Sequence, residues 1–278
     1  MFLCAAILSD LHGADLQQTM DSIMGNRAGA AVALDMESGR ILAHYHLKMA
    51  AQRLAPPGSV VKPFTLLALL GSGTRPRAIV CRRTLLIGGR QMDCTHPASP
   101  DPLDGVAALA YSCNYYFASV ARGLRDSDLV ETFTRAGLTS RTGLYADEAL
   151  GAIVPPNSVE ARQLLALGAN IRITPLELVF AYRKLALQRN LPPTVLDGLK
   201  AATEYGTARL ARPAAVAVAG KTGTALDPAS GQAHAWFAGF APAESPRIAL
   251  VVFLEQGTGG RDAAPIAREL FQVVLPAL

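Results

Sequence analysis

The sequence of 278 residues lacks several features that define whole classes of protein. It has no stripe of Lys and Arg with interleaved aromatic residues, which argues against nucleic-acid binding. No apolar run approaches the roughly 20 residues of a membrane-spanning helix, so no membrane span is predicted. Internal repeats and low-complexity segments are absent, and only 17% of the residues are charged. These absences leave a globular protein as the expected class.

Cysteine is also scarce, because four residues are too few for a disulfide-built scaffold. Cys81 and Cys94 nevertheless flank a hairpin-like stretch around 86–89. A four-residue loop there would pair Leu85 with Arg90 and set the two cysteines opposite each other. The sequence leaves open whether they form a disulfide or remain two thiols. A disulfide would indicate an oxidising compartment.

The N-terminus carries a short apolar stretch, Phe2 to Leu8, with no Lys or Arg before it. This pattern fits equally the remnant of an export signal, taken as 1–20, and an ordinary buried segment. The remainder, 21–278, is long enough for one large domain with a buried core. The formal net charge of +4 comes from scattered basic residues, which are expected to form a solvated surface.

Hydrophobic patterns predict strands near both ends of the chain and helices between them. The expected strands cover 28–35, 40–46, 215–221, 234–241 and 247–255, before a final helix at 263–274. The segment from about 72 to 212 is mostly helical and contains a capping box from Thr174 to Glu177. The predicted fold class is α+β, an antiparallel sheet of N- and C-terminal strands flanked by helices, with a mainly helical lobe inserted.

Three short motifs occur once each, namely S-x-x-K at 59–62, S-x-N at 112–114 and K-T-G at 221–223. Pro63 is tolerated only in the first turn of a helix, so the helix that runs to Leu70 is expected to begin at about Ser59. The dipole there favours developing negative charge. Lys62, one turn further, is expected to reach the serine hydroxyl and to act as its base. The bland alternative is a helix cap followed by a solvated lysine.

The second motif, Ser112-Cys113-Asn114, precedes an apolar helical run. In an extended segment, Ser112 and Asn114 would face the same way into a cleft, while Cys113 would face the core as a buried thiol. A hydroxyl in that cleft can pass a proton to a leaving amine, and an amide can hold a substrate backbone. Taken alone, the motif is more typical of a helix cap.

The third motif is the most specific of the three. Lys221-Thr222-Gly223-Thr224 is expected to end a strand rich in small residues. Gly223 would let a substrate backbone approach an edge strand, and Lys221 with a threonine hydroxyl would bind a terminal carboxylate. The backbone N–H groups of Thr224 and Ser59 are candidate donors of an oxyanion hole.

With these motifs in this order, the sequence resembles the transpeptidase domain of penicillin-binding proteins, in the penicillin-recognising serine enzyme superfamily. The resemblance begins at about Ala28 and includes stretches outside the motifs, such as 173–178 and 235–242. It implies an acyl-enzyme on Ser59, formed from a D-alanyl-D-alanine stem peptide of peptidoglycan or from a β-lactam. The acyl group then passes to an amine (D,D-transpeptidase) or to water (D,D-carboxypeptidase), and the sequence does not separate the two.

The catalytic residues that the resemblance implies are Ser59, Lys62, Ser112 and Asn114. Ser59 is the nucleophile and Lys62 its base, and the other two serve proton relay and substrate positioning. The substrate-binding residues that it implies are Lys221, Thr222, Gly223 and Thr224. The resemblance implies no metal and no organic cofactor. It implies a periplasmic or other extracytoplasmic place in the cell envelope, with stem peptides, β-lactams and a cell-envelope protein as partners.

Two other functions remain open. A β-lactamase or β-lactam sensor shares the fold, but the sequence has neither an E-x-x-L-N nor a Y-G-N motif. A non-catalytic pseudo-transpeptidase that binds the wall is the second alternative, and the intact motifs argue against it. Wall-building members usually carry further N-terminal modules and an anchor. The sequence shows none, which leaves a stand-alone, a recruited or a truncated enzyme open.

Three minor candidates complete the sequence analysis. His44 and His46 alternate along a strand and have the spacing to hold a metal together, although a solvated strand face is the simpler explanation. His234 and Trp236 share one face of their strand and are expected to pack in the core or the cleft wall. The segment 257–260 is expected to be a loop beside the cleft.

Overall fold

The computed structural model describes residues 15–74 and 76–276. Most of the predicted export-signal remnant, together with Cys4, lies outside the described residues. Residues 15–24 are helical, and Leu16, Met20 and Met24 are buried against the sheet. Within the described ranges, no helix has both the length and the apolar character needed to cross a bilayer.

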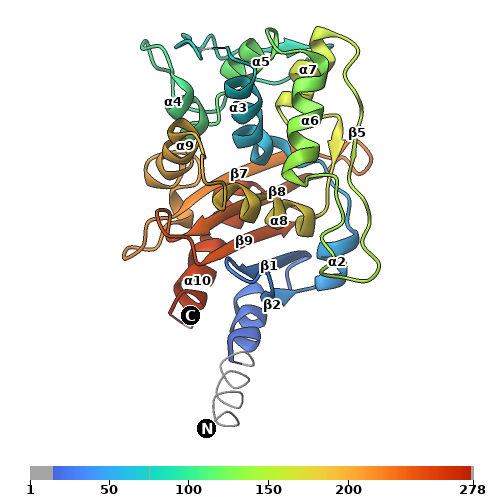
Figure 1. Ribbon diagram of the computed structural model, residues 1–278, viewed down its shortest axis with the longest axis vertical. Coiled ribbons are helices and arrows are strands. Elements are labelled where there is room, and N and C mark those ends of the chain that lie inside the picture. Colours follow the sequence, from blue (N-terminus) through green and yellow to red (C-terminus); the bar gives the residue numbers. More distant parts are fainter. Residues whose placement is uncertain (1–14, 75, 277–278) are drawn as a thin grey trace.

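Five antiparallel strands form one sheet in the order β2-β1-β9-β8-β7 (Figure 1). The strands are β1 (Gly29–Asp35), β2 (Ile41–Tyr45), β7 (Ala219–Leu226), β8 (Ala233–Ala241) and β9 (Ile248–Leu254). The N-terminal β1 pairs with the C-terminal β9, so the two ends of the chain meet in the middle of the sheet. The predicted fold class is confirmed. The strand predicted at 215–221 is wrong at both ends, because β7 begins later and continues beyond the K-T-G motif.

Side chains alternate between the two faces of the sheet along each strand, and both faces are buried. In β1, Val32 faces one apolar cluster with helix α8 (Pro175–Ala186), whereas Ala33 faces a second cluster with helix α10 (Ala264–Val274). In Figure 1, α8 lies over the sheet and α10 lies beneath it. The predicted capping box at the start of α8 is confirmed, since Thr174 Oγ1 accepts from Glu177 N at 3.1 Å and Glu177 Oε2 accepts from Thr174 N at 2.8 Å.

The remaining larger helices gather on the α8 side of the sheet (Figure 1). They are α3 (Lys62–Gly71), α4 (Gly105–Ala110), α5 (Asn114–Ala121), α6 (Asp126–Ala136), α7 (Val159–Ala166) and α9 (Pro193–Glu204). Three small elements complete the fold. They are the helix α2 (Leu47–Gln52), the strand pair β5 (Ala152–Ile153) and β6 (Ile171–Arg172), and the turn η2 (Arg209–Ala211). Helix α3 contacts α5, α6 and α9, so the helix that carries the S-x-x-K lysine is central to this lobe.

The hairpin between Cys81 and Cys94 forms with a different register from the predicted one. Its strands β3 (Leu86–Ile87) and β4 (Arg90–Gln91) are joined by only two residues, Gly88 and Gly89, whose φ angles are 53° and 77°. A two-residue turn with positive φ at both positions matches the twist of the strands, which is why Gly-Gly selects it over the four-residue loop. The backbone of Cys94 therefore bonds to Arg83 rather than lying opposite Cys81.

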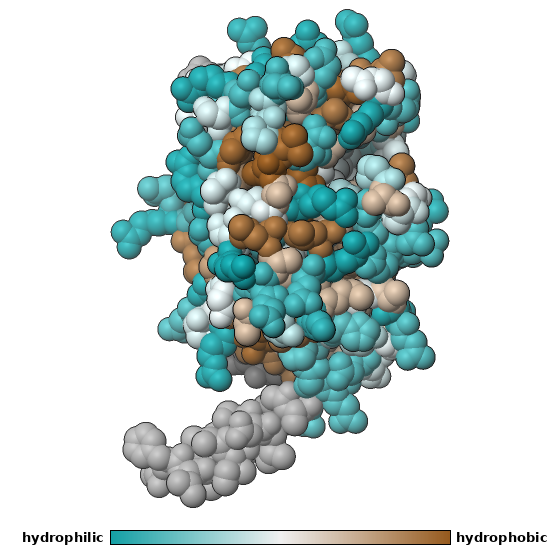
Figure 2. Space-filling model, turned by 90° about the vertical axis from the view of Figure 1, so that its right-hand side faces the viewer, coloured by the Kyte–Doolittle hydropathy of each residue, from teal (hydrophilic) through white to brown (hydrophobic). Residues whose placement is uncertain are grey.

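Figure 2 shows one face of the molecule, on which apolar residues form separate patches between hydrophilic ones. The most exposed large apolar side chains, such as Leu86, Val154 and Leu226, belong to distant segments of the chain. Scattered apolar residues of this kind are normal on a globular surface. The site is therefore sought where the polar residues of the three motifs meet.

Candidate active site

Ser59 lies in a short 3-10 turn, η1 (Gly58–Val61), that leads directly into α3. The prediction of an α-helix from Ser59 is therefore wrong by one turn, since the α-helix begins at Lys62. The cause is Pro63, which has no N–H to bond to the carbonyl of Ser59 four residues back. That carbonyl accepts instead from the N–H of Lys62, which is the 3-10 pattern.

The turn with Ser59 packs closely against the K-T-G strand. A Cβ atom on Gly223 would lie 2.6 Å from the carbonyl oxygen of Pro57, and one on Gly58 would lie 2.9 Å from that of Thr224. The hydroxyl of Tyr182 in α8 also donates to the carbonyl of Val60 at 2.9 Å. Glycines thus allow two backbones to approach, and the serine is held beside the edge strand β7.

Gly168 supports the same turn, and this gives a first testable prediction. Its φ is 82°, and a Cβ atom there would collide with the backbone of Gly58. We expect Gly168→Ala to lower the free energy of unfolding by about 3 kcal/mol, from the strain plus the collision. Gly143→Ala is the matched control, because its φ is 76° with nothing within 4 Å. Denaturant unfolding of both variants checks this, and equal losses would contradict it.

Lys62 is fully buried and is bound by the S-x-N motif. Its Nζ donates to the carbonyl of Ser112 at 2.7 Å, to Ser112 Oγ at 3.1 Å and to Asn114 Oδ1 at 2.5 Å. The structure therefore brings the first two motifs together. The predicted direct contact between Lys62 and Ser59 is replaced by this arrangement, since no hydrogen bond joins their side chains among the described residues.

Burial lowers the pKa of Lys62 to about 8, because the charged form loses its hydration. The ring of Phe117 lies 5.4 Å from Nζ and covers one side of the amine. An ammonium has three hydrogens, and all three are directed at the groups named above. When the amine is neutral, two donors remain for the carbonyl of Ser112 and for Asn114, and its lone pair is free to accept from a hydroxyl.

The S-x-N segment is a turn between α4 and α5 and not the predicted extended segment. Ser112 adopts a left-handed conformation with a φ of 58°, which only a minority of non-glycine residues adopt. Cys113, and neither predicted polar residue, is the N-cap of α5. As predicted, Cys113 is buried, while Asn114 Nδ2 donates to the carbonyls of Met92 and Asp93 at 3.0 and 3.2 Å.

Lys221 is the second fully buried lysine of the site. Its Nζ donates to Thr207 Oγ1 at 3.2 Å and to the carbonyl of Thr222 at 3.0 Å. Burial, followed by the nearby charge of Lys62, lowers the pKa of Lys221 well below its ordinary value. The hydroxyl of Thr222 donates to Thr207 Oγ1 at 2.9 Å. Sequence reasoning missed Thr207, because it follows α9 without any motif around it.

Thr224 is the exposed residue of the segment from Lys221 to Thr224. Its hydroxyl accepts from the N–H of Gly259 at 3.0 Å. Gly259 opens η3 (Gly259–Ala263), a π-helical turn that contacts both β7 and β8. The segment 257–260 therefore lies beside the K-T-G strand, where the sequence analysis expected a loop.

A partly buried cluster of charged residues lies at the far end of β7. The guanidinium of Arg172 donates twice to Asp227 at 3.1 Å, and that of Arg53 donates to Glu255 at 2.6 and 2.8 Å. The pKa of Asp227 is lowered, first by its bond with Arg172. His234 lies between the two carboxylates, 3.3 Å from Asp227 Oδ2. His234 is fully buried against Phe253, as the predicted core packing requires, and in addition its ring nitrogens contact both carboxylates.

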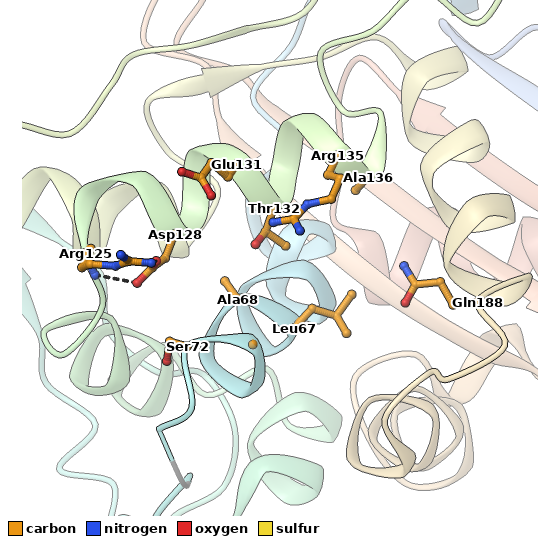
Figure 3. A pocket seen from close by; sticks show the side chains of 11 residues that line it. Leu67, Ala68, Ser72, Arg125, Asp128, Glu131, Thr132, Arg135, Ala136 and Gln188 are labelled. Carbon is orange, nitrogen blue, oxygen red and sulfur yellow. Dashed lines mark hydrogen bonds and ion pairs between the residues drawn. The ribbon is translucent and has the colours of Figure 1, made fainter.

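One groove on the described surface lies away from the three motifs. It has a volume of about 370 Å³ and lies between α3 and α6 (Figure 3). Leu67 and Ala68 line it from α3, and the ion pair of Arg125 with Asp128 lines it from α6. No residue of the three motifs lines this groove, so Ser59 and β7 form the candidate active site.

Comparison with known proteins identifies the family of the chain. A family model described as the penicillin binding protein transpeptidase domain matches residues 29–272. The peptidoglycan D,D-transpeptidase PbpA of Mycolicibacterium smegmatis is 28% identical, over 82% of this chain and 57% of its own length. The peptidoglycan D,D-transpeptidase FtsI of Escherichia coli is also 28% identical, over 74% of this chain and 40% of its own length. The chain thus spans about half the length of these relatives.

Solved structures of low sequence identity share the fold. Penicillin-binding protein A of M. tuberculosis, solved as a ceftriaxone acyl-enzyme complex, has a TM-score of 0.81 at 22% identity and covers 94% of this chain and 78% of its own. The transpeptidase domain of Burkholderia pseudomallei penicillin-binding protein 3 has a TM-score of 0.81 at 20% identity and covers 97% and 94%. At these identities, the likeness supports the fold.

Proposed function

Since the chain belongs to the penicillin-binding protein transpeptidase family, we propose that it is a serine acyl-transferase acting on D-alanyl-D-alanine stem peptides of peptidoglycan. Ser59 is the nucleophile of this proposal, and β-lactams acylate the same oxygen. The observation that carries the proposal is the buried Lys62, held by Ser112 and Asn114 one turn from Ser59 and beside the K-T-G strand.

In the proposed reaction, neutral Lys62 accepts the proton of Ser59 as its oxygen attacks the carbonyl of the penultimate D-alanine. The N–H groups of Ser59 and Thr224 stabilise the oxyanion. Ser112 then passes a proton from Lys62 to the leaving amine of the last D-alanine, as the C–N bond breaks. An amine of a neighbouring strand, or water, attacks the ester and releases Ser59.

The substrate carboxylate is proposed to bind at Lys221, Thr222 and Thr224. Lys221 is buried without a carboxylate partner among the described residues, so an incoming anion would supply the missing negative charge. Asn114 is proposed to hold the peptide backbone, and Gly223 to let that backbone approach β7. Both proposals require the edge position of β7, which leaves one side of the strand unpaired within the sheet.

We further propose 21–278 as the catalytic unit, with the segment 72–212 as its inserted lobe. Because the proposed substrate is peptidoglycan, the enzyme is proposed to act in the periplasm or elsewhere in the cell envelope. A cell-envelope protein is a proposed partner, since the structure of a Helicobacter pylori relative is a complex between penicillin-binding protein PBP2 and MreC.

The proposal is tested with a short peptide ending in D-Ala-D-Ala and a labelled D-amino acid as acceptor. Mass spectrometry is expected to detect released D-alanine, with labelled product for transpeptidation or trimmed peptide for carboxypeptidation. A benzylpenicillin adduct lost within seconds would favour the β-lactamase or sensor alternative. No adduct and no D-alanine release, from a protein that remains folded, would favour the non-catalytic alternative.

Thr207 gives a prediction specific to carboxylate binding. Thr207→Val removes the hydroxyl that bonds both Lys221 and Thr222. We expect KM for the peptide to rise about tenfold, the equivalent of one lost hydrogen bond, with a smaller change in kcat. Steady-state kinetics check this, with Thr132→Val in the groove between α3 and α6 as the control. An unchanged KM would exclude Thr207 from carboxylate binding.

A further inference from the structure

One group of side chains with metal-ligating atoms lies close together in the described part of the chain. It consists of Cys81, Cys94, His96 and Cys113, whose ligand atoms all lie within 4.8 Å of one another. It does not include His44 or His46, which the sequence analysis considered for metal binding. We propose that these four residues form a structural zinc site of the Cys3His type beside the S-x-N motif.

The sulfur positions match a shared metal better than a disulfide. Cys81 Sγ lies 3.6 Å from Cys94 Sγ, and Cys94 Sγ lies 3.8 Å from Cys113 Sγ. None of the three cysteines forms a disulfide with another described residue. With Zn–S bonds of about 2.3 Å, the edge of a tetrahedron is about 3.8 Å. A disulfide would join only two of the three sulfurs, whereas one zinc ion accounts for the convergence of all three.

Each of the three sulfurs accepts a hydrogen bond from a backbone N–H group. The N–H of Arg83 lies 3.3 Å from Cys81 Sγ, that of Tyr115 lies 3.3 Å from Cys94 Sγ, and that of Tyr116 lies 3.4 Å from Cys113 Sγ. Such donors stabilise the negative charge of a thiolate, which is the form that binds metal. This is the outer support that ligands of a metal site usually have.

His96 supplies the fourth ligand atom. Its side chain is 94% buried, and its Nδ1 lies 2.8 Å from the carbonyl of Pro97. A carbonyl can only accept, so Nδ1 carries the proton and Nε2 carries the lone pair. Nε2 is buried and has no hydrogen-bond partner among the residues that the structure describes. A metal ion would satisfy this orphaned nitrogen, and the bond from Nδ1 to a backbone carbonyl is the arrangement that orients ligating histidines.

The site would connect both sides of the hairpin to the S-x-N turn, called here the catalytic loop. The two-residue turn of the hairpin sets Cys94 diagonally to Cys81, and His96 follows two residues later. Cys113 is the central residue of the S-x-N motif, between Ser112 and Asn114. A zinc ion would therefore hold in place the left-handed turn from which these two residues reach Lys62. This inference goes beyond the proposed function, and its first test does not depend on activity.

The test is the metal content of the full chain purified without chelator, measured by plasma mass spectrometry. We expect about one zinc per chain, with fourfold coordination by three sulfurs and one nitrogen in X-ray absorption. Cobalt(II) added to the metal-free protein is expected to give the sulfur-to-metal charge-transfer band of a tetrahedral thiolate site. Both measurements use the wild-type chain, so they do not depend on a variant that folds.

Single variants assign the ligands. Cys81→Ser, Cys94→Ser and His96→Ala are each expected to weaken zinc binding at least about 100-fold. Cys4→Ser and His44→Ala are the matched controls and are expected to keep one zinc. In the chelated wild type, acylation by benzylpenicillin is expected to slow and to recover when zinc is added.

Two results would overturn the proposal. The first is a wild-type chain that holds no zinc as purified and gives no cobalt charge-transfer band on titration. The second is a disulfide between Cys81 and Cys94 in the native protein, found by mass spectrometry of unreduced peptides. If zinc binds but neither its removal nor its addition changes the acylation rate, zinc binding stands. Only the role of zinc in holding the catalytic loop would then be excluded.

Discussion

Ser59→Ala is expected to abolish the covalent adduct that the wild-type chain forms with benzylpenicillin. Alanine removes the only oxygen that the proposed reaction acylates. The acylation rate should fall at least about 10⁴-fold, because the variant has no hydroxyl at residue 59 on which the acyl-enzyme can form. Intact-mass spectrometry over time measures this directly.

The control for this variant is Ser72→Ala. Ser72 ends the same helix α3, and its hydroxyl donates to the carbonyl of Leu69 at 2.8 Å, away from the motifs. The Ser72→Ala variant should be acylated on Ser59 at the wild-type rate. Both variants should unfold at the wild-type temperature, since Ser59 Oγ makes no hydrogen bond to a described residue. An adduct on Ser59→Ala would place the nucleophile elsewhere.

Lys62→Met is expected to give the second large effect, a fall in acylation rate of about 10³-fold, as for loss of a general base. Methionine has a similar shape and suits the buried site beside Phe117. The acceptors on Ser112 and Asn114 lose their donor, so a moderate loss of stability is also expected. Lys184→Met, at an exposed lysine whose Nζ donates to the carbonyl of Arg135 away from the motifs, is the matched control.

The wild-type pH profile separates a base from a merely structural lysine. The pKa of Lys62 is about 8, and only the neutral amine accepts a proton. The acylation rate should therefore level off above about pH 8 and fall roughly tenfold per pH unit below it. Lys62→Met should lose this dependence. A wild-type rate that stays flat from pH 6 to 9 would contradict the role of Lys62 as the base.

The fold class could be predicted because its signals are local. Alternation of apolar residues marks β1, β8 and β9 within a few residues of their observed ends, and the capping box marks the start of α8. The hairpin between Cys81 and Cys94 was predicted with the wrong register. Its two-residue turn depends on the positive φ angles of Gly88 and Gly89, whereas the sequence pattern was equally compatible with a four-residue loop.

The candidate site was predicted residue by residue, but its contacts were not. The motifs indicated Ser59, Lys62 and Asn114, yet the spacing within S-x-x-K suggested that the lysine would bond to the serine. Its partner is instead the S-x-N turn, fifty residues later for Ser112, as the hydrogen bond shows. Thr207 and His96 have no motif at all, and only their positions in space reveal them.

The sequence by itself determined which residue types are available and where each helix or strand is favoured, because Pro63, the glycines and the apolar periodicity act over a few neighbouring positions. The tertiary structure alone decided which side chains meet. Lys62 loses its water and bonds to the S-x-N turn because α3 packs against α5, and the three sulfurs converge because the hairpin folds over the start of α5. Contacts between distant segments depend on the packing of whole elements, which no local pattern specifies.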